Sequence, residues 1–265
     1  MAGQGLKAAT RSKASSATSE EQRLIRLGER DIPVLLRRSS RRTFALQIDE
    51  RGVRVSVPQL ARETDIERFV AGNGRWLLDK LAARRERHAE QLFDPVDGAR
   101  FSVLGEHCRV RLEACGRGAR WRAGPDGVEE LVLDPAHEPR AAMIRALRKR
   151  ALPWFSERVA EYCFRSGCAV PPVRLSSART RWGSCSAGSG IRLHWRLIHL
   201  PPALIDYVVA HEVAHLAEMN HSPRFWAVVG SLYPGWKAAR AALRKAALAL
   251  PIIEATAAGG FLNED

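Results

Sequence analysis

Three histidines and two glutamates, one of them directly after the first histidine, lie within eleven residues, "HEVAHLAEMNH", from His211 to His221. On a helix, residues four apart are separated by about 40° in azimuth, so His211 and His215 would present their rings to one metal ion. Glu212 would project about 60° to the other side of His215, which suits a general base better than a metal ligand. The pattern predicts a metal site that activates water, with Glu212 taking the proton as the water attacks a carbonyl.

A catalytic zinc site needs a third protein ligand and one open position. His221 follows His215 by six residues, so its ring can join the site only if the helix ends between them. We expect that end near Glu218–Asn220, with Asn220 in the left-handed conformation and Pro223 preventing continuation. The predicted ligands of one zinc ion are His211, His215 and His221.

The elements around this motif have recognisable signals of their own. Pro201 and Pro202 precede "ALIDYVVAHEVAHLAEM", and proline suits the first turn of a helix. Before them, "VRLSSARTRWGSCS" and "IRLHWRLIHL" read as an antiparallel hairpin joined by the turn "AGSG". A long helix is expected from about Arg140 to Ser166, kinked at Pro153, and "GWKAARAALRKAALAL" predicts a last amphipathic helix.

The N-terminal half has a strand pattern. "IPVLLRRS", "TFALQID" and "VRVSVP" predict a hairpin or meander, and a helix from about Thr64 is expected to break at Gly72–Gly74. Further short strands follow, so the fold class is α+β: a β-rich region with one helix, then a small catalytic unit of helix, β-hairpin, HExxH helix and C-terminal helix. The expected divisions are a disordered leader (1–30), a β-rich region (31–138), a metallohydrolase domain (139–255) and a tail (256–265).

Composition limits the setting in which this chain works. Five cysteines form no CxxC pair, no secretory signal is recognisable, and no run of about 18 apolar residues could span a membrane. We therefore expect a soluble, cytoplasmic protein with no membrane partner. The formal charge of +13 favours polyanionic partners, so nucleic acid could bind through the basic surface.

Four segments together resemble a known family: "RWGSC", "WRL", "IDYVVAHEVAHLAEMNHSPRFW" and "LYPGW". They are similar to the YgjP-like family of metal-dependent hydrolases, which is related to the SprT-like and WLM zincin peptidases. The resemblance covers most of residues 30–250. It implies a zincin-like metallopeptidase unit, with Glu212 as catalytic base and with zinc bound by His211, His215 and His221.

The hairpin is the expected place for a substrate. An extended peptide can add to the edge of a sheet, Gly183 would allow close backbone approach, and Arg179 or Arg181 could orient a carboxylate or phosphate. Core packing of Trp182 and a buried free thiol at Cys185 are the structural alternatives. The candidate substrate-binding residues are Arg179, Arg181, Trp182, Gly183, Ser184 and His194.

One residue departs from the family pattern. Members usually have "LNWRL" where this chain has "LHWRL", so any role of that asparagine is in doubt here. His194 is expected to face solvent from its strand, and the alternative is an extra polar group in the cleft. The other histidines lack ligand spacing and are expected on the surface: His88, His107, His137 and His199.

Three functions remain open from the residues. The first is a zinc metallopeptidase that cleaves peptides or proteins with metal-activated water. The second keeps the metal and cleaves a nucleotide phosphoanhydride, as a nucleoside triphosphate pyrophosphohydrolase similar to a UTP pyrophosphatase would. The third is a nucleic-acid-associated protease of SprT-like type, although no dedicated nucleic-acid-binding motif is recognisable.

Overall fold

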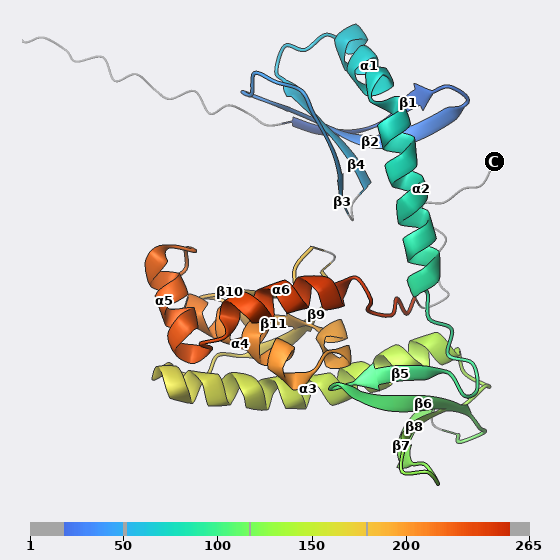
Figure 1. Ribbon diagram of the computed structural model, residues 1–265, viewed down its shortest axis with the longest axis vertical. Helices are drawn as coiled ribbons and strands as arrows, with labels where there is room; N and C mark the ends of the chain where they lie inside the picture. Colours follow the sequence, from blue (N-terminus) through green and yellow to red (C-terminus); the bar gives the residue numbers. More distant parts are fainter. Residues whose placement is uncertain (1–18, 50–51, 117, 179, 255–265) are drawn as a thin grey trace, which may run out of the picture. The chain divides into compact units, whose positions relative to one another are not determined.

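A computed structural model describes residues 19–49, 52–116, 118–178 and 180–254. Helices and small sheets mix along the chain, which confirms the α+β class (Figure 1). The chain forms two compact units, divided between Arg85 and Glu86. Each unit has a hydrophobic core of its own. No helix among the described residues is long and apolar enough to cross a membrane.

The sheet of the N-terminal unit has the strand order β1-β2-β4-β3. β2 and β4 are parallel, with Leu36 opposite Val55, so the strands do not follow one another as a meander would. The alternative of a meander was wrong, because β4 pairs between β2 and β3, whereas the hairpin is confirmed for β3 and β4, which are antiparallel. The strands are β1 (Ser19–Leu27), β2 (Arg30–Ser39), β3 (Ala45–Asp49) and β4 (Gly52–Pro58).

β1 lies inside the segment expected to be a leader, 1–30. It pairs antiparallel with β2 along its whole length and buries Ile25 and Leu27 in the core. The expectation was therefore wrong from Ser19 onward. The rest of the expected leader and the tail from residue 256 lie outside the described residues.

Two helices follow this sheet, α1 (Glu63–Gly72) and α2 (Gly74–Gln91). Asn73 ends α1 and its backbone N–H donates to the carbonyl of Val70, so the expected break at Gly72–Gly74 is confirmed. Ile66, Val70 and Leu77 are fully buried against the sheet residues of the same core.

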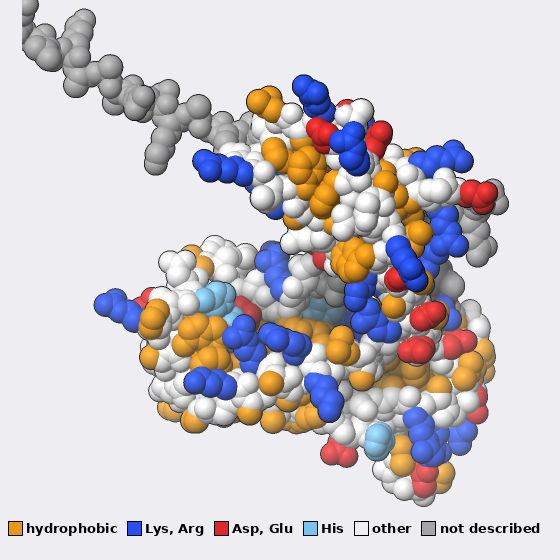
Figure 2. Space-filling view, turned by 45° about the horizontal axis from the view of Figure 1, so that its top comes forward, with side chains coloured by type: hydrophobic (Ala, Val, Ile, Leu, Met, Phe, Trp, Pro, Cys, Tyr) orange, Lys and Arg blue, Asp and Glu red, His pale blue; other side chains and the backbone are white. Residues whose placement is uncertain are grey.

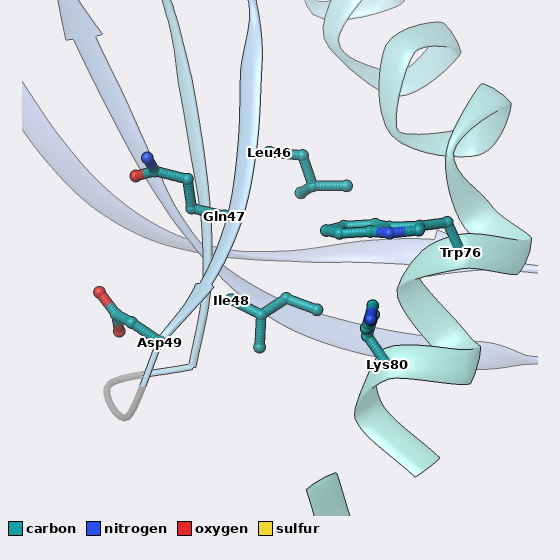
Figure 3. Close-up of a pocket in the computed structure, with 6 residues that line it drawn as sticks. All are labelled: Leu46, Gln47, Ile48, Asp49, Trp76 and Lys80. Atoms are coloured by element: carbon teal, nitrogen blue, oxygen red, sulfur yellow. The ribbon is translucent and has the colours of Figure 1, made fainter. Parts of the chain in front are cut away.

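A hollow in this unit lies between the edge strand β3 and α2 (Figure 3). Leu46 and Ile48 point toward Trp76 and Lys80, whereas Gln47 points the other way, as alternation along a strand requires (Figure 3). Its lining includes no histidine or cysteine, so it offers none of the nitrogen and sulfur ligands that zinc prefers.

The C-terminal unit begins with a second sheet of the same design, order β5-β6-β8-β7, in which β6 and β8 are parallel. Phe101 and Leu131 of this sheet share a core with Met143 of the next helix. The expected boundary near residue 138 was therefore misplaced, because the sheet shares its core with the helix that carries His211 and His215. Its strands are β5 (Arg100–Val103), β6 (Glu106–Leu112), β7 (Ala119–Ala123) and β8 (Glu129–Leu133).

α3 (Pro139–Ser166) is the long helix that the sequence predicts. The carboxylate of Glu138 accepts hydrogen bonds from the first backbone N–H groups, and Gly167 ends the helix with a φ of 68°. Pro153 lies inside α3, which continues on both sides of it. The helix runs the length of the unit and packs on α4, η1 and β9 (Figure 1).

A three-stranded sheet of order β10-β11-β9 precedes the motif helix. The expected hairpin is confirmed, since β10 and β11 are antiparallel. The second strand is shorter than expected, because the chain turns into a 3-10 helix at Trp195. The elements are β9 (Val173–Ser176), β10 (Gly183–Ser186), β11 (Gly190–His194), η1 (Trp195–His199), α4 (Pro202–Ala217), α5 (Pro223–Leu232) and α6 (Trp236–Ala247).

The two ends of the C-terminal unit meet beyond α6. Leu92 and Ile252 form a parallel β-bridge. The N–H of Phe93 donates to the carbonyl of Ile252 at 2.9 Å, and the N–H of Ile252 donates to that of Gln91 at 2.8 Å. These bonds hold the segment after α6 against the segment that follows α2.

Candidate metal centre

α4 carries the HExxH motif, and its apolar residues bury most of its surface. Ile205, Val209 and Val213 are at most 1% exposed and pack in the core of the C-terminal unit. Pro202 occupies the first turn, where its missing N–H costs no hydrogen bond. A helix buried to this extent holds its polar side chains in fixed directions.

An ion pair ties the start of α4 to α3. The guanidinium of Arg158 donates two hydrogen bonds, each 2.7 Å, to the two carboxylate oxygens of Asp206. Both side chains are mostly buried, and the bidentate geometry fixes distance and orientation together. The pair therefore stabilises the placement of the motif helix on α3.

The end of α4 allows His221 to reach the other histidines. α4 ends at Ala217, and Glu218 is extended, with φ −136° and ψ 103°. The side chain of Ser222 then caps α5 by accepting from the N–H of Phe225. The early stop is confirmed, but the left-handed Asn220 was wrong: Leu104 is the non-glycine residue with positive φ among the described residues.

His211, His215 and His221 form one cluster, with candidate ligand nitrogens all within 4.8 Å of one another. The Nε2 atoms of His211 and His221 are 3.1 Å apart. The Nδ1 atom of His215 lies 3.1 Å from the carbonyl of Glu218, to which an Nδ1–H would donate, leaving Nε2 for a metal. The ring of Phe225 stacks on His215 at 4.4 Å and limits its rotation.

Electrostatics favours the metal-binding form of these histidines. Burial lowers the pKa of His211 to about 4, and the charges of His215, His221 and Arg240 act in the same direction. Burial also lowers the pKa of His215. Neutral imidazole is the form that binds a metal, so the cluster is prepared to bind without first losing protons.

Glu212 directly follows His211 on α4 and is 4% exposed. Its Oε2 atom is buried and has no hydrogen-bond partner among the described residues. Burial raises the pKa of its carboxyl to about 8, and the positive charge of Arg181 opposes that rise. An unpaired buried carboxylate is costly, so this group fits a place beside a cation and a proton-carrying substrate or water.

β10 is the edge strand of its sheet and lies against α4. A Cβ atom on Gly183 would come within 2.5 Å of Glu212 Oε1, so the absence of a side chain there makes room for the carboxylate. The structure thus brings Gly183 against the carboxylate of Glu212, and the charge of Arg181 also acts on that carboxylate. No strand pairs with the outer side of β10 within the described parts of the chain.

The other residues predicted on the hairpin have mixed outcomes. Trp182 is partly buried and packs against the core, as the structural alternative expects. Ser184 and Cys185 are partly buried on β10, and burial raises the pKa of the Cys185 thiol. Arg179 lies outside the described residues.

His194 does not face solvent, so that expectation was wrong. It is 8% exposed, and its ring meets Trp182 edge to face at 5.4 Å. Its Nδ1 accepts a hydrogen bond of 3.1 Å from the N–H of Arg196 and so caps η1. The ring therefore has a local structural partner that no periodicity in the sequence could indicate.

His199 was also placed on the surface by sequence and is in fact 4% exposed. Its Nδ1 lies 2.7 Å from the carbonyl of Ser102, and its Nε2 is buried without a partner among the described residues. His88, His107 and His137 are exposed, as expected. The error for His199 arises because its burial depends on β5, almost a hundred residues earlier.

The donors present fit a zinc ion. Three imidazoles converge, and no described cysteine or carboxylate joins the cluster. Glu212 directly follows His211 on α4, and its buried Oε2 has no hydrogen-bond partner among the described residues. Three histidines with one remaining position form a common ligand set for catalytic zinc. The arrangement suits hydrolysis by activated water.

Comparison with known protein families matches residues 42–246 to the YgjP-like, metallopeptidase domain family. This chain belongs to that family. Among solved structures, the YgjP-like chain is similar to the metallopeptidase zymogen of Pyrococcus abyssi abylysin, with 22% identity and a TM-score of 0.33. The match covers 37% of this chain and 99% of that chain. No curated protein matches it. Family membership and the histidine cluster together indicate a metallohydrolase.

Proposed function

We propose that this YgjP-like chain is a zinc-dependent metallopeptidase. The observation that carries the proposal is the convergence of three histidine nitrogens around α4, which also carries the buried Glu212 and lies against the edge strand β10. His211, His215 and His221 would hold one zinc ion. Zinc in such a site supplies Lewis acidity toward water and toward a carbonyl oxygen.

Glu212 is the proposed general base. Its Oε2 has no partner among the described residues, so it would be able to accept a proton from the attacking water and deliver it to the leaving amine. The pKa of about 8 applies to the carboxyl without a neighbouring metal. A dication at the histidines favours the ionised carboxylate by direct attraction, which makes it an acceptor at neutral pH.

β10 is the proposed binding place for an extended peptide. An added strand would form main-chain hydrogen bonds along the outer edge of β10 and would place one carbonyl near the cluster. Gly183 lies on β10 and also contacts Glu212, so β10 would position both the bound peptide and the proposed base.

A second candidate is a nucleoside triphosphate pyrophosphohydrolase. Two cations favour it: Arg181 lies near Glu212, and Arg240 lies near His211, as their effects on the pKa values of those groups indicate. Arginines stabilise the charge of a transferring phosphoryl group. We rank the peptidase first because the edge strand β10 lies against Glu212 and can pair with a peptide backbone, which a nucleotide lacks.

The test measures zinc content and hydrolysis together. Purified full-length chain, loaded with zinc, is assayed against a peptide library and the nucleoside triphosphates in parallel with Glu212→Gln. We expect one zinc ion per chain, peptide cleavage by the wild type, and a loss of kcat of about 10²- to 10⁴-fold in Glu212→Gln with zinc retained. Full activity of Glu212→Gln would overturn the mechanism, and triphosphate hydrolysis without peptide cleavage would favour the second candidate.

A further inference from the structure

The surface next to the histidine cluster has an unusual charge distribution. Between Glu218 and Glu254 the sequence contains no Asp or Glu, but it contains five basic residues. In this stretch α5 and α6 border the site. The five are Arg224, Lys237, Arg240, Arg244 and Lys245.

Three of these cations share one face of α6. Lys237, Arg240 and Arg244 have the spacing i, i+3, i+7, and all three are exposed. Ala239 and Leu243 form the buried face. Lys237, Arg240 and Arg244 are called the α6 basic face below. Figure 2 shows blue side chains on the C-terminal unit close to pale blue histidines.

Arg240 connects this face to the cluster. Its guanidinium carbon lies over the ring of Trp226, 5.3 Å from the centroid. The same ring is 5.8 Å from that of His211 and 5.9 Å from that of His221. Trp226 in turn stacks on Trp236 at 4.3 Å, which fixes α5 against the start of α6. One indole therefore separates the Arg240 charge from the proposed metal ligands.

Within the described ranges, these cations have no acidic partner. No described carboxylate is within ion-pair distance of Lys237, Arg240 or Arg244, although Asp and Glu occur elsewhere in the unit. By contrast, the buried Glu130 is within 3.6 Å of Arg109, 3.0 Å of Arg111 and 2.9 Å of Arg122. Arginines on that sheet serve the fold, whereas the charges of the α6 basic face are free for a ligand.

We propose that the site selects peptides with acidic residues beside the scissile bond, and that the α6 basic face recognises them. This inference rests on the proposed peptidase function. A peptide along β10 with a carbonyl at the cluster continues past it, and a carboxylate there can approach Arg240. Arg181 is exposed, its charge acts on Glu212, and it has no ion pair with a described carboxylate, so it favours the same sign of charge.

The ring contacts favour a peptide over a nucleic acid. Single-stranded nucleic acids are bound by aromatic rings presented for base stacking along a basic groove. Here the Trp226 ring is engaged by Trp236 and Arg240. The ring thus positions a guanidinium, which suits a bidentate contact with a side-chain carboxylate.

The test uses zinc-loaded full-length chain and peptides that differ only in having Glu, Gln or Lys beside one cleavable bond. We expect kcat/KM to follow the order Glu, Gln, Lys, with roughly two- to fivefold between steps and a smaller spread at high salt. Arg240→Gln should reduce the differences in kcat/KM among the three peptides, and Arg240→Glu should reverse their order. Arg100→Gln, an exposed arginine on β5, is the charge-matched control and should leave the spread unchanged.

A binding measurement separates this inference from the proposed function. Fluorescence anisotropy with Glu212→Gln protein should show the Glu peptide bound more tightly than the Lys peptide, and less so after Arg240→Gln. If peptides are cleaved or bound without charge preference, the specificity inference fails and the peptidase stands. If no peptide is cleaved or bound, both fail, and tighter binding of a single-stranded oligonucleotide at the α6 basic face would replace acidic peptides with nucleic acid.

Discussion

The Cα of Gly183 on β10 lies against the carboxylate of Glu212 on α4, so that a Cβ at this glycine would be 2.5 Å from Oε1 and 2.6 Å from Cγ. Gly183→Ala should therefore displace the proposed base while leaving the histidines in place. We expect zinc to remain bound and kcat to fall by about 10²-fold, since a shift of about 1 Å in a catalytic group costs that much.

A matched control exists in the turn after β10. A Cβ on Gly188 would meet no atom within 4 Å, so Gly188→Ala should keep both zinc and activity. Equal losses in the two variants would mean that alanine disturbs the hairpin generally, and a fully active Gly183→Ala would show that Glu212 does not depend on this contact.

Removal of one ligand should uncouple metal binding from folding. His221 is exposed and lies outside α4 and α5, so His221→Ala should leave the fold intact and weaken zinc binding. For the wild type, zinc at 100 times its Kd should stabilise the folded chain by about 2.7 kcal/mol, and a chelator should reverse this. Thermal unfolding with and without zinc measures both, and an equal zinc-dependent shift in His221→Ala would contradict the assigned ligand.

Stability should fall in mild acid because of His199. Burial lowers its pKa from 6.5 to about 4, so between these values the unfolded chain binds a proton that the folded chain does not. The part of the free energy of unfolding that depends on neutral His199 is fully present above about pH 6.5. It is lost as the pH falls toward 4, and the total loss is about 3 kcal/mol. Denaturant unfolding of the metal-free protein at pH 8, 6 and 5 tests this.

His199→Gln should flatten that decline. At pH 8, the difference in the free energy of unfolding between variant and wild type measures the lost contact with the Ser102 carbonyl. The change of this difference with pH measures the effect of protonating His199. Parallel curves at all three pH values would contradict a depressed pKa for His199.

The Arg158–Asp206 pair should contribute measurably to stability. Asp206→Asn keeps the shape of the side chain but removes its charge, and it leaves a mostly buried guanidinium poorly paired. We expect the free energy of unfolding to fall by about 2 kcal/mol. Glu161→Gln is the control, because Glu161 pairs with the same arginine from a more exposed position; equal effects would contradict the importance of burial.

Local patterns predicted most elements but not their pairing. The alternation around Val53 and Val55 identifies β4, and Pro202 marks the start of α4. The parallel pairing of β2 with β4 joins strands that β3 separates in the sequence, and no local pattern indicates that pairing. β1 was missed because only Ile25 and Leu27 of its residues are buried, so the alternating apolar pattern is weak. Its pairing with β2 holds the other residues in the strand.

The metal site was predictable where it is local. His211 and His215 are related by one helical turn, and Pro223 marks the interruption that brings His221 back. The contact of Gly183 with Glu212 joins two elements about thirty residues apart, so sequence could suggest a glycine with a close neighbour but not which neighbour. His194 and His199 were misplaced for the same reason, since their partners come from Trp182 and Ser102.

The β-bridge between Leu92 and Ile252 places the entry and exit of the C-terminal unit side by side. A unit whose ends adjoin can be transplanted as a cassette, inserted into a loop of another protein or circularly permuted, because neither operation requires its interior to stretch.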